Sequence, residues 1–218
     1  MSEQNSKTLA VYDHLAQKYI DNTTVHDSLN PAKAKKKRAK LEAFLLESFS
    51  KIPKGGKILE CGSGGGKEAL FLKKTGFDII ASDVAEAFLS SCRKQGLVTM
   101  KLDIINDNLP NGLSGVLVWR TFVHFAKEDL EKVFQKVYTA LETGGVFVFN
   151  VFNREDSDVD EKWEDFPDEY QMGEKRFFAF YSEDFINSLI EKTGFKINTF
   201  FKQGGDSGRK WLCYVVTK

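Results

Sequence analysis

The stretch KILECGSGGGKEALFL, residues 57–72, decides the fold. It begins with an apolar run of strand length, continues with four glycines within residues 62–66, and ends with apolar residues at helical spacing. A glycine-rich turn between a strand and a helix leaves backbone N–H groups free at the helix N-terminus, and doubly wound α/β sheets bind ligands there. The stretch therefore predicts a strand, a ligand-binding turn and a helix.

Two familiar glycine patterns do not match this turn. A triphosphate-binding loop with its lysine at Lys67 would need a glycine at Cys61 and a hydroxyl group at Glu68. A dinucleotide-binding GxGxxG pattern that starts at Gly62 would need its third glycine at Lys67. The chain instead has the pattern ExGxGxG over residues 60–66, with an acid at the end of the strand.

The acid, Glu60, indicates a different ligand. A carboxylate repels a pyrophosphate at the helix N-terminus, but it attracts ammonium and sulfonium groups, and S-adenosylmethionine carries both. Asp83 ends the next apolar run 23 residues further on, which is the ribose-binding position of doubly wound nucleotide sites. Asp103 ends the third run, where its carboxylate is placed to accept a hydrogen bond from an adenine amino group. The three acids together predict an S-adenosylmethionine site.

Apolar runs of strand length alternate with amphipathic segments along the chain. The predicted strands cover residues 57–61, 77–82, 97–103, 115–119 and 146–152, with helical segments between them. Several runs are apolar on both faces, which is typical of buried parallel strands in a doubly wound sheet. A last helix follows at 182–194. Two further strands, at 195–201 and 211–216, are joined by a glycine-rich loop that predicts an antiparallel pair.

The length of 218 residues and the globular composition predict a single domain over residues 1–218. Within it, we expect an N-terminal helical cap of two helices at residues 1–52 and a Rossmann-like core at residues 53–218. Residues 153–176 form an acidic and aromatic insertion without clear periodicity. Long ordered insertions of this kind are often functional lids.

Charge and composition disfavour several classes of partner. The 31 basic and 31 acidic residues balance, so no net field favours nucleic acid or an anionic membrane surface. The basic run at residues 33–40 fits the solvated face of a helix, and we do not expect nucleic acid as a partner. No segment has the length of a membrane span, and the three cysteines are scattered without zinc spacing. We therefore expect a cytoplasmic protein with no membrane partner and no metal ligands.

The chain resembles the class I S-adenosylmethionine-dependent methyltransferases over nearly its whole length. The elements that carry the resemblance are, in order, the helix YDHLAQKY, the turn ECGSGGG, Asp83, Asp103 and the passage ALETGGVFVFNVF. The resemblance implies a Rossmann-like doubly wound α/β sheet of seven strands, in the order 3-2-1-4-5-7-6 with strand 7 antiparallel, and N-terminal helices. It also implies S-adenosyl-L-methionine as the cofactor. The tail from residue 196 and the segment KRFFAFYSEDF are similar to small stand-alone methyltransferases of unassigned substrate.

The fourth predicted strand departs from the family pattern. Relatives usually open this strand with an acid, where the chain has Ser114 and Gly115, and they usually have a small residue in place of Arg120. No [DN]PP[YF] motif follows the strand, which disfavours methylation of nucleobase amino groups. We therefore expect a small-molecule or peptide acceptor that is methylated by in-line transfer.

Two alternatives use the same sheet. A nicotinamide-dependent oxidoreductase is disfavoured by Lys67 at the third glycine position of its fingerprint. A non-catalytic module that binds a cofactor or a partner receives slight support from the unusual Gly115 and Arg120. The sequence does not choose between a monomer and a homodimer.

The candidate site residues fall into three groups. The expected cofactor-binding residues are Tyr19, Glu60, Gly62, Ser63, Gly64, Gly66, Asp83, Val84, Asp103, Ile104, Trp119 and Arg120. His124, just past the fourth strand, is a candidate general base, or else a partly buried histidine in the first turn of the next helix. Arg120 is also a candidate to bind a substrate carboxylate in bidentate fashion, or else it merely neutralises neighbouring acids. The candidates for acceptor binding, which would alternatively pin the insertion to the body, are Trp163, Tyr170, Arg209 and Trp211.

Overall fold

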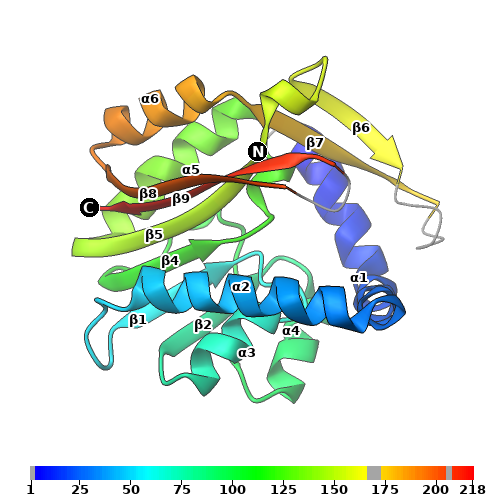
Figure 1. Cartoon of the computed structure of the whole chain (residues 1–218), viewed down its shortest axis with the longest axis horizontal. Coiled ribbons are helices and arrows are strands. Elements are labelled where there is room, and N and C mark those ends of the chain that lie inside the picture. The colour runs from blue at the N-terminus through cyan, green and yellow to red at the C-terminus, as the bar shows by residue number, and fades with distance from the viewer. Residues whose placement is uncertain (1–2, 166–172, 205–207) are drawn as a thin grey trace.

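The chain folds around a sheet in which seven strands follow the order β3-β2-β1-β4-β5-β9-β8 (Figure 1). The computed structural model describes residues 3–165, 173–204 and 208–218. The parallel strands are β1 (Lys57–Cys61), β2 (Asp78–Asp83), β3 (Val98–Lys101), β4 (Leu113–Val118) and β5 (Leu141–Asn153). β9 (Lys210–Thr217) runs antiparallel to β5 and to β8 (Lys196–Gly204). The predicted seven-strand order is therefore confirmed, with β8 and β9 as strands 6 and 7.

Helices cover both faces of this sheet (Figure 1). On one face lie α2 (Pro31–Phe49), α3 (Lys67–Lys74) and α4 (Glu86–Lys94), which share a buried apolar cluster with the strands. On the other face lie α5 (Lys127–Ala140) and α6 (Glu183–Thr193), whose apolar sides pack into a second cluster rich in phenylalanine. All six residues of β4 are buried, because helices cover the strand from both sides.

The N-terminal segment forms two helices, as expected. α1 (Glu3–Leu29) packs against α4 and the strand β7 (Lys175–Tyr181), with Thr8 and Ala16 buried. α2 begins after Asn30, whose Oδ1 accepts a hydrogen bond from the Lys33 N–H at 3.2 Å, and Pro31 follows as the first helical residue. The asparagine and proline together fix the break between the two helices.

β6 (Glu161–Asp165) and β7 are two strands that the sequence did not predict. They pair with each other, and β7 also pairs with the last two residues of β5, beyond the end of β4. The residues from Phe177 to Tyr181 are all buried, so β7 lacks the alternation of a half-exposed strand. Part of the insertion predicted at residues 153–176 therefore forms β6 and the start of β7, and it extends the sheet.

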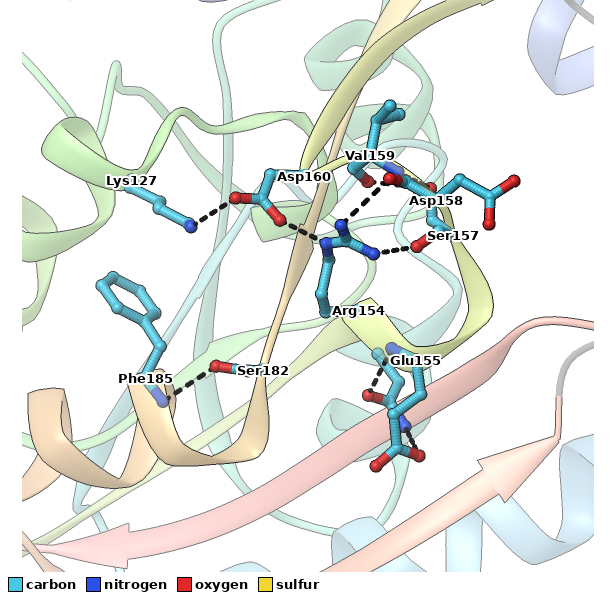
Figure 2. Close-up of polar contacts among 10 residues, drawn as sticks. Lys127, Arg154, Glu155, Ser157, Asp158, Val159, Asp160, Ser182 and Phe185 are labelled. Atoms are coloured by element: carbon cyan, nitrogen blue, oxygen red, sulfur yellow. Dashed lines mark hydrogen bonds and ion pairs between the residues drawn. The ribbon is translucent and has the colours of Figure 1, made fainter.

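The turn between β5 and β6 is organised around Arg154, which lies in the short 3-10 helix η2 (Arg154–Asp156) (Figure 2). The Arg154 guanidinium donates to the Asp160 carboxylate and to the backbone oxygens of Ser157 and Asp158. Lys127 of α5 donates to the other Asp160 oxygen at 3.0 Å. These contacts attach the beginning of the insertion to the start of α5.

All three cysteines are buried free thiols. Within the described ranges, no helix combines the length and the apolar character needed to cross a membrane. The same ranges contain no group of three or more His, Cys, Asp or Glu side chains arranged to hold a metal ion.

Candidate active site

A cavity of about 370 Å³ lies at the carboxyl ends of the central parallel strands, with α1 forming one of its walls. Open α/β sheets bind ligands at this edge. The predicted site residues that line the cavity are Tyr19, Glu60, Gly62, Ser63, Gly64, Asp83, Val84, Asp103, Ile104, Trp119, Arg120 and His124. Lining residues that the sequence reasoning did not name include Thr8, Phe88, Gln95 and Thr121. Thr8 lies one helical turn before Tyr12, so helical periodicity is a signal that would have found it.

The glycines of the first turn are required for two different reasons. Gly62 has a φ of 74°, and a Cβ there would lie 2.3 Å from Thr121 Oγ1, so only glycine lets β1 approach the end of β4 this closely. Gly66, with a φ of 76°, does not line the cavity. A Cβ at Gly66 would meet Cys92 Sγ at 2.7 Å and Leu97 Cδ1 at 2.8 Å. This glycine therefore allows the start of α3 to pack closely against α4 and Leu97.

Asp83 ties the glycine turn to the end of β2. Its Oδ2 accepts from the Gly64 N–H at 2.9 Å and its Oδ1 accepts from the Ala85 N–H at 3.0 Å. The side chain is 7% exposed, and burial raises its pKa while the backbone N–H groups oppose that rise. The carboxylate therefore faces the cavity from a fixed position.

Glu60 is a buried acid at the end of β1. It is 2% exposed, and its Oε2 has no hydrogen-bond partner among the described residues. Burial raises its pKa well above the usual range, the nearby Glu68 adds to this effect, and the Ala69 N–H and the Arg38 guanidinium act against it. A cationic ligand group in the cavity would supply the missing partner.

Asp103 combines a place in the cavity wall with a turn-capping role. Its Oδ1 accepts from the Ile105 N–H at 2.9 Å, and its Oδ2 accepts from the Asn106 amide at 2.7 Å. Such a capping role is open to any aspartate that stands before a turn. Both oxygens thus have partners within the turn, although Asp103 also lines the cavity.

His124 lies in a short 3-10 helix, η1 (Phe122–His124), and both of its ring nitrogens have partners. Nδ1 lies 2.7 Å from the backbone oxygen of Phe177, which can only accept, so Nδ1 carries the proton. Nε2 lies 3.1 Å from the Tyr12 hydroxyl and therefore accepts from it. The Tyr12 oxygen in turn accepts from Arg176 Nη1 at 3.0 Å. Burial, together with the Arg176 charge, lowers the His124 pKa to about 3, so the ring is neutral at physiological pH.

Two residues at the end of β4, Trp119 and Arg120, line the cavity. Trp119 is 8% exposed, and its indole N–H has no partner among the described residues. Arg120 is exposed and has a φ of 62°, a left-handed conformation that few residues other than glycine adopt. Its backbone N–H donates to Oδ1 of the buried Asn150 at 2.6 Å, which holds this conformation.

Three further acceptor-binding candidates, Trp163, Arg209 and Trp211, do not line this cavity. Arg209 pairs with Glu164 and lies over the rings of Phe152, Phe178 and Phe180, with 5.3 Å from the guanidinium carbon to the Phe152 ring centre. The Trp211 ring centre lies 4.2 Å from that of Phe152. Trp163, on β6, is 39% exposed and contacts Phe177. These contacts hold the insertion against the body, and Tyr170 lies outside the described residues.

The cavity residues fit S-adenosylmethionine by the chemistry of their donor and acceptor groups. The unpartnered Glu60 oxygen suits a cation, and it would repel a phosphate. Asp83, at the end of the neighbouring strand, suits a ribose diol. The aromatic side chains of Tyr12, Tyr19 and Phe88 enclose the site from the side of α1 and α4.

Comparisons with known proteins agree with this chemistry. A model of the methyltransferase domain family matches residues 34–199. A search of curated proteins found no match. The solved structures with the same fold include an S-adenosylmethionine-dependent methyltransferase from Clostridium acetobutylicum ATCC 824, with a TM-score of 0.70 and 19% identity over 91% of this chain and 98% of that one. A DhpI–SAH complex has a TM-score of 0.70 and 16% identity over 99% of this chain and 98% of that one.

A third solved structure is the magnesium protoporphyrin IX methyltransferase ChlM from Synechocystis PCC 6803 with bound SAM. Its TM-score is 0.64, with 11% identity over 84% of this chain and 78% of that one. The fold and the site thus define a class I methyltransferase. The chain belongs to the methyltransferase domain family and is an S-adenosylmethionine-dependent enzyme.

Proposed function

We propose that the cavity binds S-adenosylmethionine through Glu60, Asp83 and Asp103, and that the enzyme methylates a small-molecule or peptide acceptor. In this assignment Glu60 faces the ammonium group, Asp83 the ribose hydroxyls and Asp103 the adenine amino group. The bound cofactor supplies a methyl group that its sulfonium already activates for attack. The protein's part is then to align the acceptor and to exclude water.

The observation that carries the proposal is Glu60, a residue of the cavity lining whose Oε2 is buried with no partner in the described part of the chain. A buried carboxylate is costly unless it has a partner, so its presence favours a ligand with a positive charge. The nicotinamide alternative is disfavoured, because the pyrophosphate of the dinucleotide would lie beside this carboxylate, which repels it. The class of ligand therefore follows from the charge of one residue.

The enclosed shape of the cavity supports a small acceptor or a short peptide segment. α1 supplies Thr8, Leu9, Tyr12, Tyr19 and Ile20 to the wall, which restricts the opening through which an acceptor reaches the site. Enclosed, mainly apolar sites strengthen the polar contacts inside them. We do not propose a nucleic acid as the acceptor, because the net charge of the chain is zero.

Calorimetric titration with S-adenosylhomocysteine tests the cofactor assignment. We expect Asp83→Ala to weaken binding about 10- to 100-fold, because about 1.4 to 2.7 kcal/mol is the scale of hydrogen bonds to a charged group. Asp78→Ala changes an exposed aspartate at the other end of β2 and serves as the matched control. NADH is titrated in parallel. Unchanged affinity in Asp83→Ala, or binding of NADH instead, would contradict the assignment.

A further inference from the structure

The chemical class of the methyl acceptor can be inferred from the cavity wall at the end of β4. The inference rests on the function proposed above, which assigns Glu60, Asp83 and Asp103 to the cofactor. The wall at the end of β4 is then left for the acceptor. It consists of Trp119, Arg120 and Thr121, with His124 and Tyr12 beside them.

This wall offers hydrogen-bond donors. Arg120 brings a guanidinium group, which binds carboxylates and phosphates in a planar, two-point manner. Trp119 brings an indole N–H that is buried and lacks a partner among the described residues. A buried donor of this kind needs an acceptor atom, and an oxyanion is the group that takes hydrogen bonds from both side chains.

The backbone conformation of Arg120 indicates that its side chain contributes to a ligand site. Glycine would adopt a φ of 62° without strain, whereas an arginine does so at a cost. The buried amide of Asn150 accepts from the Arg120 N–H at 2.6 Å and keeps the residue in this conformation. Strained residues that the surrounding structure holds in place occur often at ligand sites.

Among the described residues of this wall, no side chain is free to remove a proton. His124 Nε2 accepts from Tyr12, and Nδ1 donates to the Phe177 oxygen, so the imidazole has no lone pair available. The Tyr12 pKa is raised to about 12, mainly by burial, so its hydroxyl stays protonated. Thr121 Oγ1 lies 3.4 Å from the backbone oxygens of Cys61, Gly62 and Trp119. An acceptor that must lose a proton before it reacts therefore finds no base here.

We propose that the acceptor is an oxyanion, a carboxylate or a phosphonate-type oxygen, that Arg120 and Trp119 bind and that itself receives the methyl group. One oxygen of the anion accepts hydrogen bonds while an equivalent oxygen attacks. The lone pair of the attacking oxygen forms the new O–C bond as the S–C bond breaks, and its electron pair stays on sulfur. A carboxylate becomes a neutral ester and a phosphonate dianion becomes a singly charged monoester, while the sulfonium becomes a neutral thioether and no proton has to move.

A labelled-methyl assay with matched acceptors tests the proposal. The panel contains carboxylic acids and phosphonic acids, together with amides, alcohols and amines on the same carbon skeletons. We expect labelled product only from the acids. Release of methanol in mild alkali identifies a carboxyl methyl ester, while an alkali-stable product identifies the phosphonate ester. Labelling of alcohols or amines with the acids inert would overturn the proposal.

Binding of acids to the enzyme loaded with S-adenosylhomocysteine gives a second readout that does not need turnover. The probes are benzoate and phenylphosphonate in the millimolar range, titrated after saturation with S-adenosylhomocysteine. We expect at least one probe to bind, with a dissociation constant at least 10-fold larger in Arg120→Gln and only partly restored in Arg120→Lys, which keeps the charge but not the two-point geometry. Lys101→Gln, at the exposed end of β3, is the control.

The two proposals fail in distinguishable ways. If the unaltered protein does not bind S-adenosylhomocysteine, the cofactor assignment is refuted before any acid is added. Normal binding of S-adenosylhomocysteine, with neither probe bound to the loaded enzyme, would refute the oxyanion acceptor alone. Equal binding of the probes to the unaltered enzyme and to Arg120→Gln would refute the role of Arg120 and with it the proposal.

Discussion

Glu60 is costly for the folded chain without a ligand, since it is buried at the end of β1 with one oxygen unpartnered among the described residues. The nearby Glu68 makes the charge less favourable still. In the proposed function, the ammonium group of the cofactor neutralises this charge. Glu60 would then lower the stability of the empty protein and raise its affinity for the cofactor, as active-site residues commonly do.

Glu60→Gln is expected to stabilise the empty protein and weaken cofactor binding. The glutamine keeps the volume and removes the buried charge, with a gain of about 1 to 2 kcal/mol in the free energy of unfolding. Because the folded-state pKa of Glu60 is raised, the cost of its charge is full at high pH and is lost as pH falls through that pKa. The stabilisation is therefore largest at pH 8 and smaller at pH 5.

Melting temperatures at the two pH values, with and without S-adenosylhomocysteine, check this prediction. Asp78→Asn removes an exposed charge from the start of β2 and is the control for a general charge effect. A lower melting temperature for the empty Glu60→Gln protein at pH 8 would show that the carboxylate stabilises the fold, contrary to the prediction.

At the scale of single residues, the sequence predicted the positions that depend on local spacing. Glu60 and Asp83 end two neighbouring strands, so their meeting in one cavity follows from the order of elements. The contacts of His124 could not be predicted from the sequence. Its partners are Tyr12, 112 residues away, and the backbone of Phe177, 53 residues away on a strand that the sequence did not reveal.

At the scale of elements, α1 is attached to the body by a few specific contacts. Thr8 Oγ1 accepts from the Phe177 N–H at 3.0 Å, and Tyr12 contacts both His124 and Arg176. Tyr12 and Tyr19 also pack on Phe88 of α4, with ring centres 6.4 and 6.0 Å from it. The helix is therefore held at β7, at η1 and at α4.

Tyr12→Phe is expected to loosen α1 while the rest of the fold stays intact. The variant keeps the ring contacts but leaves Nε2 of the partly buried His124 without its donor, a loss of about 1 to 3 kcal/mol. Hydrogen exchange should then be faster in α1 and unchanged in β1 and β4. His14→Ala, an exposed position on the same helix, is the control. Equal exchange rates in both variants would mean that the hydroxyl does not hold the helix.

The elements that the sequence missed share one physical cause. β7 is buried at every position from Phe177 to Tyr181, and β6 is a short strand of mostly charged residues. β7 lacks the period of a half-exposed strand, and β6 has charged side chains, Lys162 and Glu164, at its two partly buried positions. Both strands depend on pairing with other segments of the chain. The parallel strands were predicted well, because their long apolar runs alternate with helices of clear periodicity.

At the scale of the whole molecule, stability depends on the cluster under α5 and α6. Phe122, Phe134, Phe147 and Phe149 contact one another there, with ring centres between 4.7 and 6.1 Å apart. All four side chains are fully buried. The packing of edges against faces adds to the burial of apolar area. This cluster joins the helices of one face to β5.

Phe134→Ala is expected to lower the free energy of unfolding by about 3 to 5 kcal/mol, since it removes a ring at the centre of this cluster. Chemical denaturation at 25 °C measures the change, and the slope of the transition should stay constant. Phe200→Ala, at a partly buried position on β8, should cost clearly less and is the control. A loss below about 1 kcal/mol for Phe134→Ala would show that the cluster repacks around the gap.

The place of α1 in the cavity wall has a consequence for the timing of catalysis. Five of its side chains face the site, so the spent donor leaves through the space that the helix occupies or beside it. Chemistry on an already activated methyl group needs little from the protein, whereas separation of a helix held at three places takes time. The first turnover would then be fast, and the rate of product release would limit the later turnovers.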